Sequence, residues 1–364
     1  KFYRWVNEGQ LAVQLQGGLD CADVTTVNTL CYLSDIDGKR ATVRFRIGSE
    51  GRQPIFAQIP IVFHRPFPEG ASIKWAYLER RMLADKPKWS VRFSIDMEVD
   101  TDRDTTSWIA VHTGWHSEPS GLRVAMWRGR DGDSGVIRLP TDWLHDYTNL
   151  DEVQSKRDED FNNVIGRLKA WIKDHGEDIP EWLREKAKSI GKWKSQARLA
   201  GLVWQWKESR FENDNWIFDL VEEWRKRDKK RWQHSRRLSV RVSRRRKDLY
   251  RKFAKRMSDR YGVVFICPLP VKELAGRTDP EDCEHDATQA HRNASHAATY
   301  LLNQCLREKF PLHAIDIDLE NLTRECSRCG HVNDAAKRRS IQCRGCGWTY
   351  DVDENAVANM LARG

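Results

Sequence analysis

The sequence contains no run of eighteen consecutive apolar residues, so we expect no helix that crosses a membrane. Its first ten residues, KFYRWVNEGQ, have no apolar segment of the kind that directs secretion. An initiator Met is also missing, and we expect the chain to be part of a longer protein. No internal repeat is present.

Cysteine is too sparse for a disulfide scaffold, because only nine are spread over 364 residues and the number is odd. Four of the nine fall in two Cys-x-x-Cys pairs, and five are scattered. This usage is typical of a reducing compartment and a single metal site. The length allows two or three domains, each with enough material for a buried core.

The two cysteine pairs have the spacing of a zinc ribbon. Cys326 and Cys329 in CSRC are followed by thirteen residues and then by Cys343 and Cys346 in CRGC. A glycine follows each pair, as a tight turn requires, and four thiolates complete a tetrahedral site with no open position. We therefore predict a structural zinc ion, although the spacing is slightly shorter than usual; the alternative is four reduced free cysteines.

Acidic residues are outnumbered, and the formal net charge is +9. Between positions 225 and 256 there are seventeen Lys or Arg and only two Asp, while Leu238, Val242, Leu249 and Phe253 recur near helical spacing. One stripe of this helix is thus apolar and the rest basic, which favours a polyanion partner over a merely solvated face. The candidate nucleic-acid contacts are Arg236, Arg237, Arg241, Arg244, Arg245 and Arg246.

Alternating and breaker residues divide the chain into a β-rich part and a mixed part. Residues 1–105 predict strands at RATVRFRI, PIFAQIPIVF and KWSVRFSIDMEV, with a helix at IKWAYLERRMLADK, residues 73–86. Residues 106–140 predict three consecutive strands, and 141–260 predict helices, the first capped by Thr141 or Asp142. A strand in YGVVFICPL, a helix over about 287–309, a strand in LHAIDID and a last helix follow, which together predict a mixed α/β sheet.

The ribbon is followed by YDVDENAVAN, and this D-x-N-A-x-x-N pattern resembles the end of the RuvC-like nuclease of type V CRISPR effectors and their TnpB relatives. The resemblance implies an RNase H-like mixed sheet in 106–320, with the basic helices 141–260 as an insertion. It also implies a β-rich, OB-like wedge domain over 1–105, the zinc ribbon over 321–350 as a nucleic-acid-binding region, and the last RuvC helix over 351–364.

A RuvC nuclease uses three carboxylates to hold two Mg²⁺ ions. On this resemblance Asp353 occupies the third position, and Cys267 aligns with the second, where Glu273 is the alternative. The first position falls on His112 in a strand that carries Gly-Trp, with Asp96 in FSIDMEV as the competing placement. Because imidazole and thiol are poor Mg²⁺ ligands, the resemblance implies a degenerate catalytic site and at most weakly held Mg²⁺.

One surviving carboxylate is similar to the situation in the type V-M effectors, which bind DNA under RNA guidance and silence it without efficient cleavage. The implied partners are a guide RNA, a target DNA and an N-terminal recognition region outside this chain, and the implied place is the bacterial cytoplasm. Two alternatives stay open. One is an active Mg²⁺-dependent nuclease that cuts DNA or processes guide RNA, and the other is a TnpB-like transposon nuclease.

Overall fold

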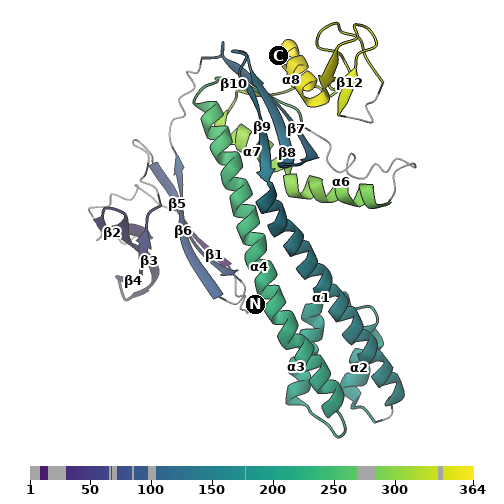
Figure 1. Ribbon diagram of the computed structural model, residues 1–364. Coiled ribbons are helices and arrows are strands. Elements are labelled where there is room, and N and C mark those ends of the chain that lie inside the picture. The colour runs from purple at the N-terminus through teal and green to yellow at the C-terminus, as the bar shows by residue number, and fades with distance from the viewer. Residues whose placement is uncertain are drawn as a thin grey trace. The chain divides into compact units, whose positions relative to one another are not determined.

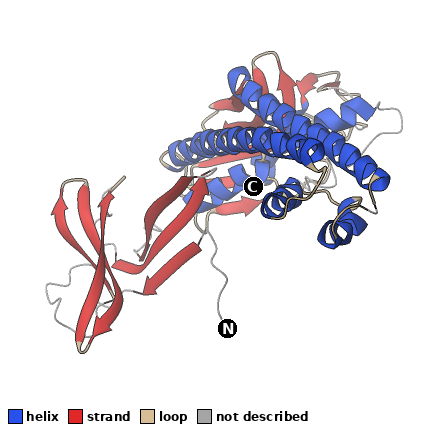
Figure 2. Cartoon of the chain, turned by 90° about the horizontal axis from the view of Figure 1, so that it is seen from below, coloured by secondary structure: helices blue, strands red, loops and turns tan. Residues whose placement is uncertain are grey.

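The computed structural model describes residues 9–14, 30–64, 67, 72–83, 86–96, 104–176, 178–268, 284–334 and 339–364. The chain divides into two compact units, Lys1–Asp102 and Arg103–Gly364 (Figure 1). The first is built from strands, and the second combines a sheet with long helices (Figure 2).

The N-terminal unit consists of two three-stranded antiparallel sheets, in the orders β1-β5-β6 and β2-β3-β4. Alternating apolar residues supply its core, in which Val43 and Phe45 of one sheet pack with Ile73 and Ala76 of the other. The strands are β1 (Gly9–Gln14), β2 (Cys31–Asp37), β3 (Arg40–Glu50), β4 (Gln53–Val62), β5 (Ser72–Leu83) and β6 (Lys86–Asp96).

The helix predicted over 73–86 is wrong, because this segment forms β5 and the start of β6. Strand β5 is the central strand of its sheet and is hydrogen-bonded to β1 on one side and to β6 on the other. A bulge between Ile73 and Trp75 shifts its alternation, so the apolar residues imitate helical spacing. The pairing with distant strands overrides that local pattern.

The C-terminal unit contains a five-stranded mixed sheet in the order β11-β10-β7-β8-β9. Strands β7, β8 and β9 form the expected antiparallel meander, and β10 and β11 run parallel to β7. The mixed α/β class predicted from the sequence is confirmed. Its strands are β7 (Trp108–Glu118), β8 (Gly121–Gly129), β9 (Ser134–Pro140), β10 (Val263–Ile266) and β11 (Ala314–Asp316).

Helices cover both faces of this sheet (Figure 1). Helices α1 (Thr141–Asp174), α4 (Asn215–Ser258) and α7 (Thr299–Lys309) pack on the face that carries Ile109 and Val111. Helix α8 (Val352–Arg363) packs through Ala356, Val357 and Met360 on the opposite face. Because residues alternate along β7, the face under α8 is also the face of His112.

The helical insertion has a second core of its own, away from the sheet. Helices α2 (Glu181–Ile190) and α3 (Gln196–Glu208) pack against the outer parts of α1 and α4 around Trp206 and Trp224. The predicted side-chain cap of α1 is wrong, since the N-cap residue is Pro140 and no side chain caps it. The helix expected over 287–309 is two, α6 (Glu284–Ala297) and α7, separated at Ala298 by a left-handed backbone conformation.

Candidate nucleic-acid interface and metal centre

The four cysteine side chains of the predicted ribbon converge at one point. All four Sγ atoms lie within 4.8 Å of one another. The Sγ atoms of Cys326 and Cys346 are 3.8 Å apart, and those of Cys329 and Cys343 are 3.6 Å apart. A tetrahedral zinc site with Zn–S bonds of about 2.3 Å has S–S edges of about 3.8 Å, so the cluster fits a metal ion of this kind.

Local backbone geometry prepares this cluster. Gly330 and Gly347 follow the two pairs with φ of 76° and 71°, values that a residue with a Cβ rarely adopts. The short hairpin of β12 (Ser340–Gln342) and β13 (Thr349–Asp351) carries the second pair. Burial raises the pKa of the Cys343 thiol, but backbone N–H groups of Cys346 and Gly345 outweigh it and lower the pKa to about 6.

The two asparagines of the N-A-x-x-N pattern fasten the ribbon to α8. Asn355 donates to the Glu325 carbonyl at 2.6 Å and accepts from the Ser327 N–H at 2.8 Å. Asn359 donates to the Leu322 and Glu325 carbonyls at 2.9 and 2.7 Å. Both side chains are buried, so they satisfy backbone groups that would otherwise lack partners.

Asp353 is 3% exposed and is surrounded by basic side chains from the sheet. His112 Nδ1 lies 3.3 Å from its Oδ1, His116 Nε2 lies 3.7 Å from its Oδ2, and the Arg123 guanidinium donates to the same Oδ2. Burial alone would raise the pKa of this carboxyl, but the two imidazoles hold it well below its usual range. Asp353 is therefore ionised in the folded protein, and Asp351 is the residue that caps α8, through the N–H groups of residues 353 and 354.

Arg123 is also 3% exposed and joins three carboxylates. Its Nη2 lies 3.3 Å from Asp351 Oδ1 and contacts Asp353, while its Nε lies 3.5 Å from Glu118 Oε1. Arg339, next to the ribbon hairpin, contacts Asp351 at 2.6 Å and Glu118 at 2.5 Å. Each of the three carboxylates thus has a guanidinium partner.

Cys267 packs in the same core cluster as Ala110 of β7. Cys267 follows β10 just as His112 follows Val111 in β7, and Val111 pairs with Ile266 in the parallel register. Cys267 is fully buried, and burial raises the pKa of its thiol to about 12, so it is a neutral apolar neighbour. Asp96 ends β6 in the other unit, 3.7 Å from Lys74, and Glu273 lies outside the described residues.

The six candidate arginines of α4 fall into two groups. Arg241 and Arg245 pair with Asp146 of α1 at 2.8 and 3.0 Å. Arg246 donates to the carbonyls of residues 295 and 296, which belong to the last turn of α6. The side chains of the other three are exposed and form no ion pair with any described residue: Arg236, Arg237 and Arg244.

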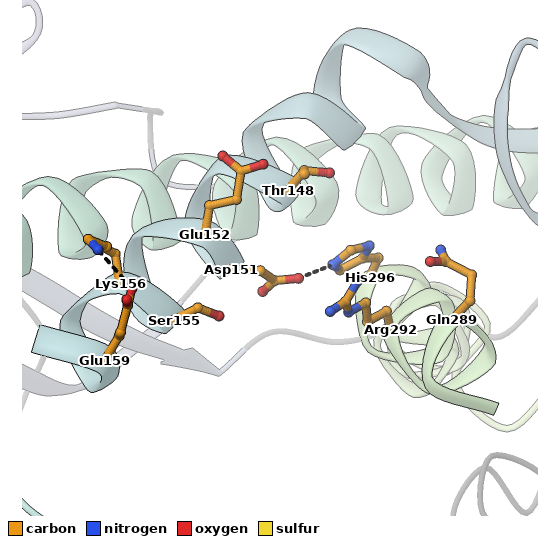
Figure 3. A pocket seen from close by; sticks show the side chains of 9 residues that line it. All are labelled: Thr148, Asp151, Glu152, Ser155, Lys156, Glu159, Gln289, Arg292 and His296. Carbon is orange, nitrogen blue, oxygen red and sulfur yellow. Dashed lines mark hydrogen bonds and ion pairs between the residues drawn. The ribbon is translucent and has the colours of Figure 1, made fainter. Parts of the chain in front are cut away.

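A groove of about 530 Å³ lies between α1 and α6 (Figure 3). Asp151 and Glu152 reach into it from α1, and Arg292 and His296 reach into it from α6. His296 Nε2 is 3.6 Å from Asp151 Oδ2, so acidic and basic groups partner each other across the groove. This pair joins α6 to α1 across the groove, so the groove does not present charge of a single sign to a ligand.

Arg123 and His116 are not among the site residues expected from the sequence, although signals for both exist. Arg123 is the one charge within the apolar strand segment GLRVAMW, and such a residue needs a buried partner. His116 lies four residues after His112, which places both on one face of a strand if no bulge intervenes. A bulge does lie between Thr113 and His116, and the two imidazoles still meet at Asp353.

Comparison with known proteins gives one family model, described as Cas12f1-like, TNB domain, which matches residues 299–360. The chain is 29% identical over its whole length to a protein of Thermanaerosceptrum fracticalcis, of which it covers 65%. It is 30% identical over 88% of its length to a protein of Mycolicibacterium mucogenicum, of which it covers 58%. Both relatives are named CRISPR-associated DNA-binding protein Cas12m.

Among solved structures, the mini-RNA-guided endonuclease CRISPR-Cas_phi3 matches 70% of this chain and 44% of its own, with 14% identity and a TM-score of 0.35. The chain spans about three fifths of the length of the curated relatives it matches. The resemblance to type V effectors is confirmed, and over that shared length this chain is a homologue of the CRISPR-associated Cas12m proteins.

Proposed function

We propose that this chain is the C-terminal nucleic-acid-binding part of an RNA-guided type V-M effector that binds target DNA without cutting it efficiently. The observation that carries this proposal is the Arg123 guanidinium held against Asp353, with His112 beside it. The name shared by the relatives, a CRISPR-associated DNA-binding protein, supports the binding part.

Our proposal assigns the five-stranded sheet to an RNase H-like, RuvC-type domain and the N-terminal unit to an OB-like wedge. The strand order and the flanking helices support the first assignment. Two small antiparallel sheets around a shared core support the second. We assign the cysteine cluster to a structural zinc ion, because its sulfur geometry suits that ion and leaves no position for substrate.

Two Mg²⁺ ions do not fit the residues found at the sheet. A magnesium site needs several oxygen ligands in near-octahedral geometry. Here His112, within β7, supplies an imidazole, and Cys267, just after β10, supplies a buried neutral thiol. The remaining carboxylate, Asp353, already faces an arginine. An arginine side chain stays protonated in proteins, so it competes with a metal ion at every accessible pH.

Affinity for nucleic acid would come from the exposed face of α4. Lys230, Arg237, Arg244 and Arg251 recur every seven residues, or about 10 Å, along one face of the helix. All four are exposed and form no ion pair with any described residue. Such a row can neutralise successive phosphates of a guide RNA or a guide–target duplex, in the cytoplasm of the bacterial host.

The test uses the native protein that contains this chain, with its guide RNA and a labelled target. We expect tight, guide-dependent DNA binding and no Mg²⁺-dependent product above background. Robust cleavage that disappears in Asp353→Ala would overturn the proposal and point to a carboxylate such as Glu273 or Asp96 completing the site. Failure to bind any nucleic acid would overturn it as well.

A further inference from the structure

A second pocket lies in the helical insertion, where α1, α3 and α4 meet. Its volume is about 440 Å³, within the range of about 300–1,000 Å³ that is usual for ligand sites. Trp204 of α3 and Trp232 of α4 line it and are 55% and 38% exposed. A large aromatic side chain left this open, beside a cavity, offers part of its surface for stacking.

The basic residues around this pocket are only partly paired, and Glu222 holds Arg225 at 2.5 and 2.8 Å. The guanidinium carbon of Arg225 lies 4.7 Å from the centre of the Trp204 ring, and Lys207 Nζ lies 5.8 Å from it. Lys229 also lines the pocket, is exposed, and forms no ion pair with any described residue. Stacked aromatic and guanidinium groups with a free ammonium nearby suit a planar ring that carries a phosphate.

The acidic residue on the pocket wall does not oppose an anion. Asp228 is held in a two-point ion pair by Arg157 of α1, with N–O distances of 2.7 and 3.1 Å. This pair fixes α1 against α4 and neutralises the wall. Ser195 lines the same pocket and can offer its hydroxyl to the edge of a ring. The Gln196 amide nitrogen already donates to Asp158 Oδ1 at 2.5 Å, which leaves its amide oxygen as an acceptor.

The pocket also adjoins the basic face of α4. Lys229 precedes Lys230, the first member of the row of four cations, and Arg236 follows Lys229 by seven residues on the same edge of the helix. A polynucleotide backbone that follows the row therefore passes the mouth of the pocket. Only a base that is not paired within a duplex can turn into it.

We infer that the Trp204–Trp232 pocket binds an unpaired nucleobase of a single-stranded nucleic acid. This inference rests on the proposed function, because the same α4 face supplies the phosphate contacts. The base stacks on the exposed Trp surface, and Lys229 contacts the adjacent phosphate. Such a site adds affinity for unpaired segments that charge along α4 alone does not provide.

The test measures binding of the chain to three labelled probes of one mixed sequence: a 20-nucleotide RNA, the same DNA strand, and the matching DNA duplex. We expect Trp204→Ala and Trp232→Ala to weaken single-strand binding about fivefold or more, as loss of one stacked base does. Duplex affinity and the salt slope stay unchanged. The two single strands show which sugar the pocket prefers.

Trp216→Ala is the matched control. Trp216 is 57% exposed, lies on α4 like Trp232, and does not line the pocket. Trp204→Phe keeps a stacking surface and should restore most of the affinity if Trp204→Ala acts by stacking. In a parallel measurement, 5-iodouridine in the single-stranded RNA should cross-link to a peptide that contains Trp204 or Trp232.

Equal losses on the duplex and the single strands would overturn the inference, as would no loss in either pocket variant. Another outcome is that the unchanged chain and Trp204→Ala bind every probe with the same affinity and the same steep salt dependence. That result would contradict the base pocket alone and leave the proposed function standing. If the unchanged chain binds none of the probes, the proposed function falls first.

Discussion

Arg123 decides at the level of a single residue what Asp353 can do. Its side chain, on β8, is almost fully buried. Its charge is compensated by the carboxylates of Asp353 in α8, of Asp351 just before α8, and of Glu118 at the end of β7. Replacing His112 and Cys267 by oxygen ligands therefore leaves the guanidinium in place beside Asp353. In the proposed function, the cation beside Asp353 therefore disfavours a Mg²⁺ site in addition to the imidazole and thiol at the other two positions.

We predict that His112→Asp with Cys267→Glu binds Mn²⁺ weakly, and that adding Arg123→Gln to this pair tightens the binding at least tenfold. The reason is that the third change frees Asp353 and removes a competing positive charge. Titration calorimetry on folded protein measures both affinities. Equal affinities in the two variants would show that Arg123 does not block the site.

Arg123→Gln by itself should lower the free energy of unfolding by about 3–5 kcal/mol, because it leaves buried carboxylates without their shared partner. Arg138 is the control, since it contacts the same Glu118 from a side chain that is 39% exposed. Arg138→Gln should cost less than about 1 kcal/mol. Urea unfolding of the three proteins compares them, and similar losses would contradict the buried network.

At the scale of the element, α4 uses one residue type for two purposes. Its exposed row can meet phosphate, whereas Arg246 holds the end of α6. We expect Arg237→Ala and Arg244→Ala each to lower the slope of log affinity against log salt by about one, the value for one phosphate contact. Arg246→Ala should leave that slope unchanged and lower the melting temperature instead. A slope change for Arg246→Ala alone would reverse this assignment.

The docking of α6 on α1 and α4 should depend on pH through His296. Burial lowers the pKa of this imidazole, and the charge of Asp151 offsets only part of the effect. Arg246 and Arg292 face it as well, and the Tyr147 ring lies against it with centroids 4.5 Å apart and the ring planes tilted by 30°. His296 is therefore neutral in the folded protein over part of the range in which the unfolded chain, with a pKa of about 6.5, binds a proton.

Because the folded pKa is depressed, the stability contributed by this histidine is present above about pH 6.5 and declines as the pH falls below it. The decline cannot exceed about 1.4 kcal/mol per pH unit for one proton. Urea midpoints between pH 5 and pH 7.5 should fall less steeply for His296→Asn than for the unchanged chain. Parallel curves would show that His296 is not the group that titrates.

At the scale of the whole C-terminal unit, the ribbon, α8 and the sheet form one connected structure. Asn355 and Asn359 of α8 bind the Glu325 carbonyl, just before the first cysteine of the ribbon. Arg339 joins the ribbon hairpin to Glu118 of the sheet. Loss of the ribbon metal should thus loosen the packing of α8 around Asp353. We predict one zinc per chain and a Cys343→Ser variant that lacks it and melts at least 5 °C lower.

Cys305→Ala is the control for that prediction, since Cys305 is a buried core thiol outside the cluster and should leave the metal content unchanged. Plasma emission measures the metal, and calorimetry measures the melting. A Cys343→Ser protein that keeps a full equivalent of zinc would exclude the cysteine cluster as its site.

The sequence alone determined the features that depend on local spacing and local chemistry. The paired cysteines with their glycines, the meander between positions 106 and 140, the long basic helix and the mixed sheet all follow from short patterns, and the structure contains each of them. The final motif also placed Asp353 at the start of the last helix.

Only the tertiary structure decided which of these residues have partners. The pairing of β5 with strands far away in the chain overrode its helical spacing, and the break at Ala298 divided one expected helix. Arg123 meets Asp353 across 230 positions, and Arg246 reaches α6 across 50, so no local pattern could predict either contact. An arginine is free to bind phosphate, or already binds a group of its own protein, according to the packing of segments that are distant in the sequence. This packing exists only in the folded chain.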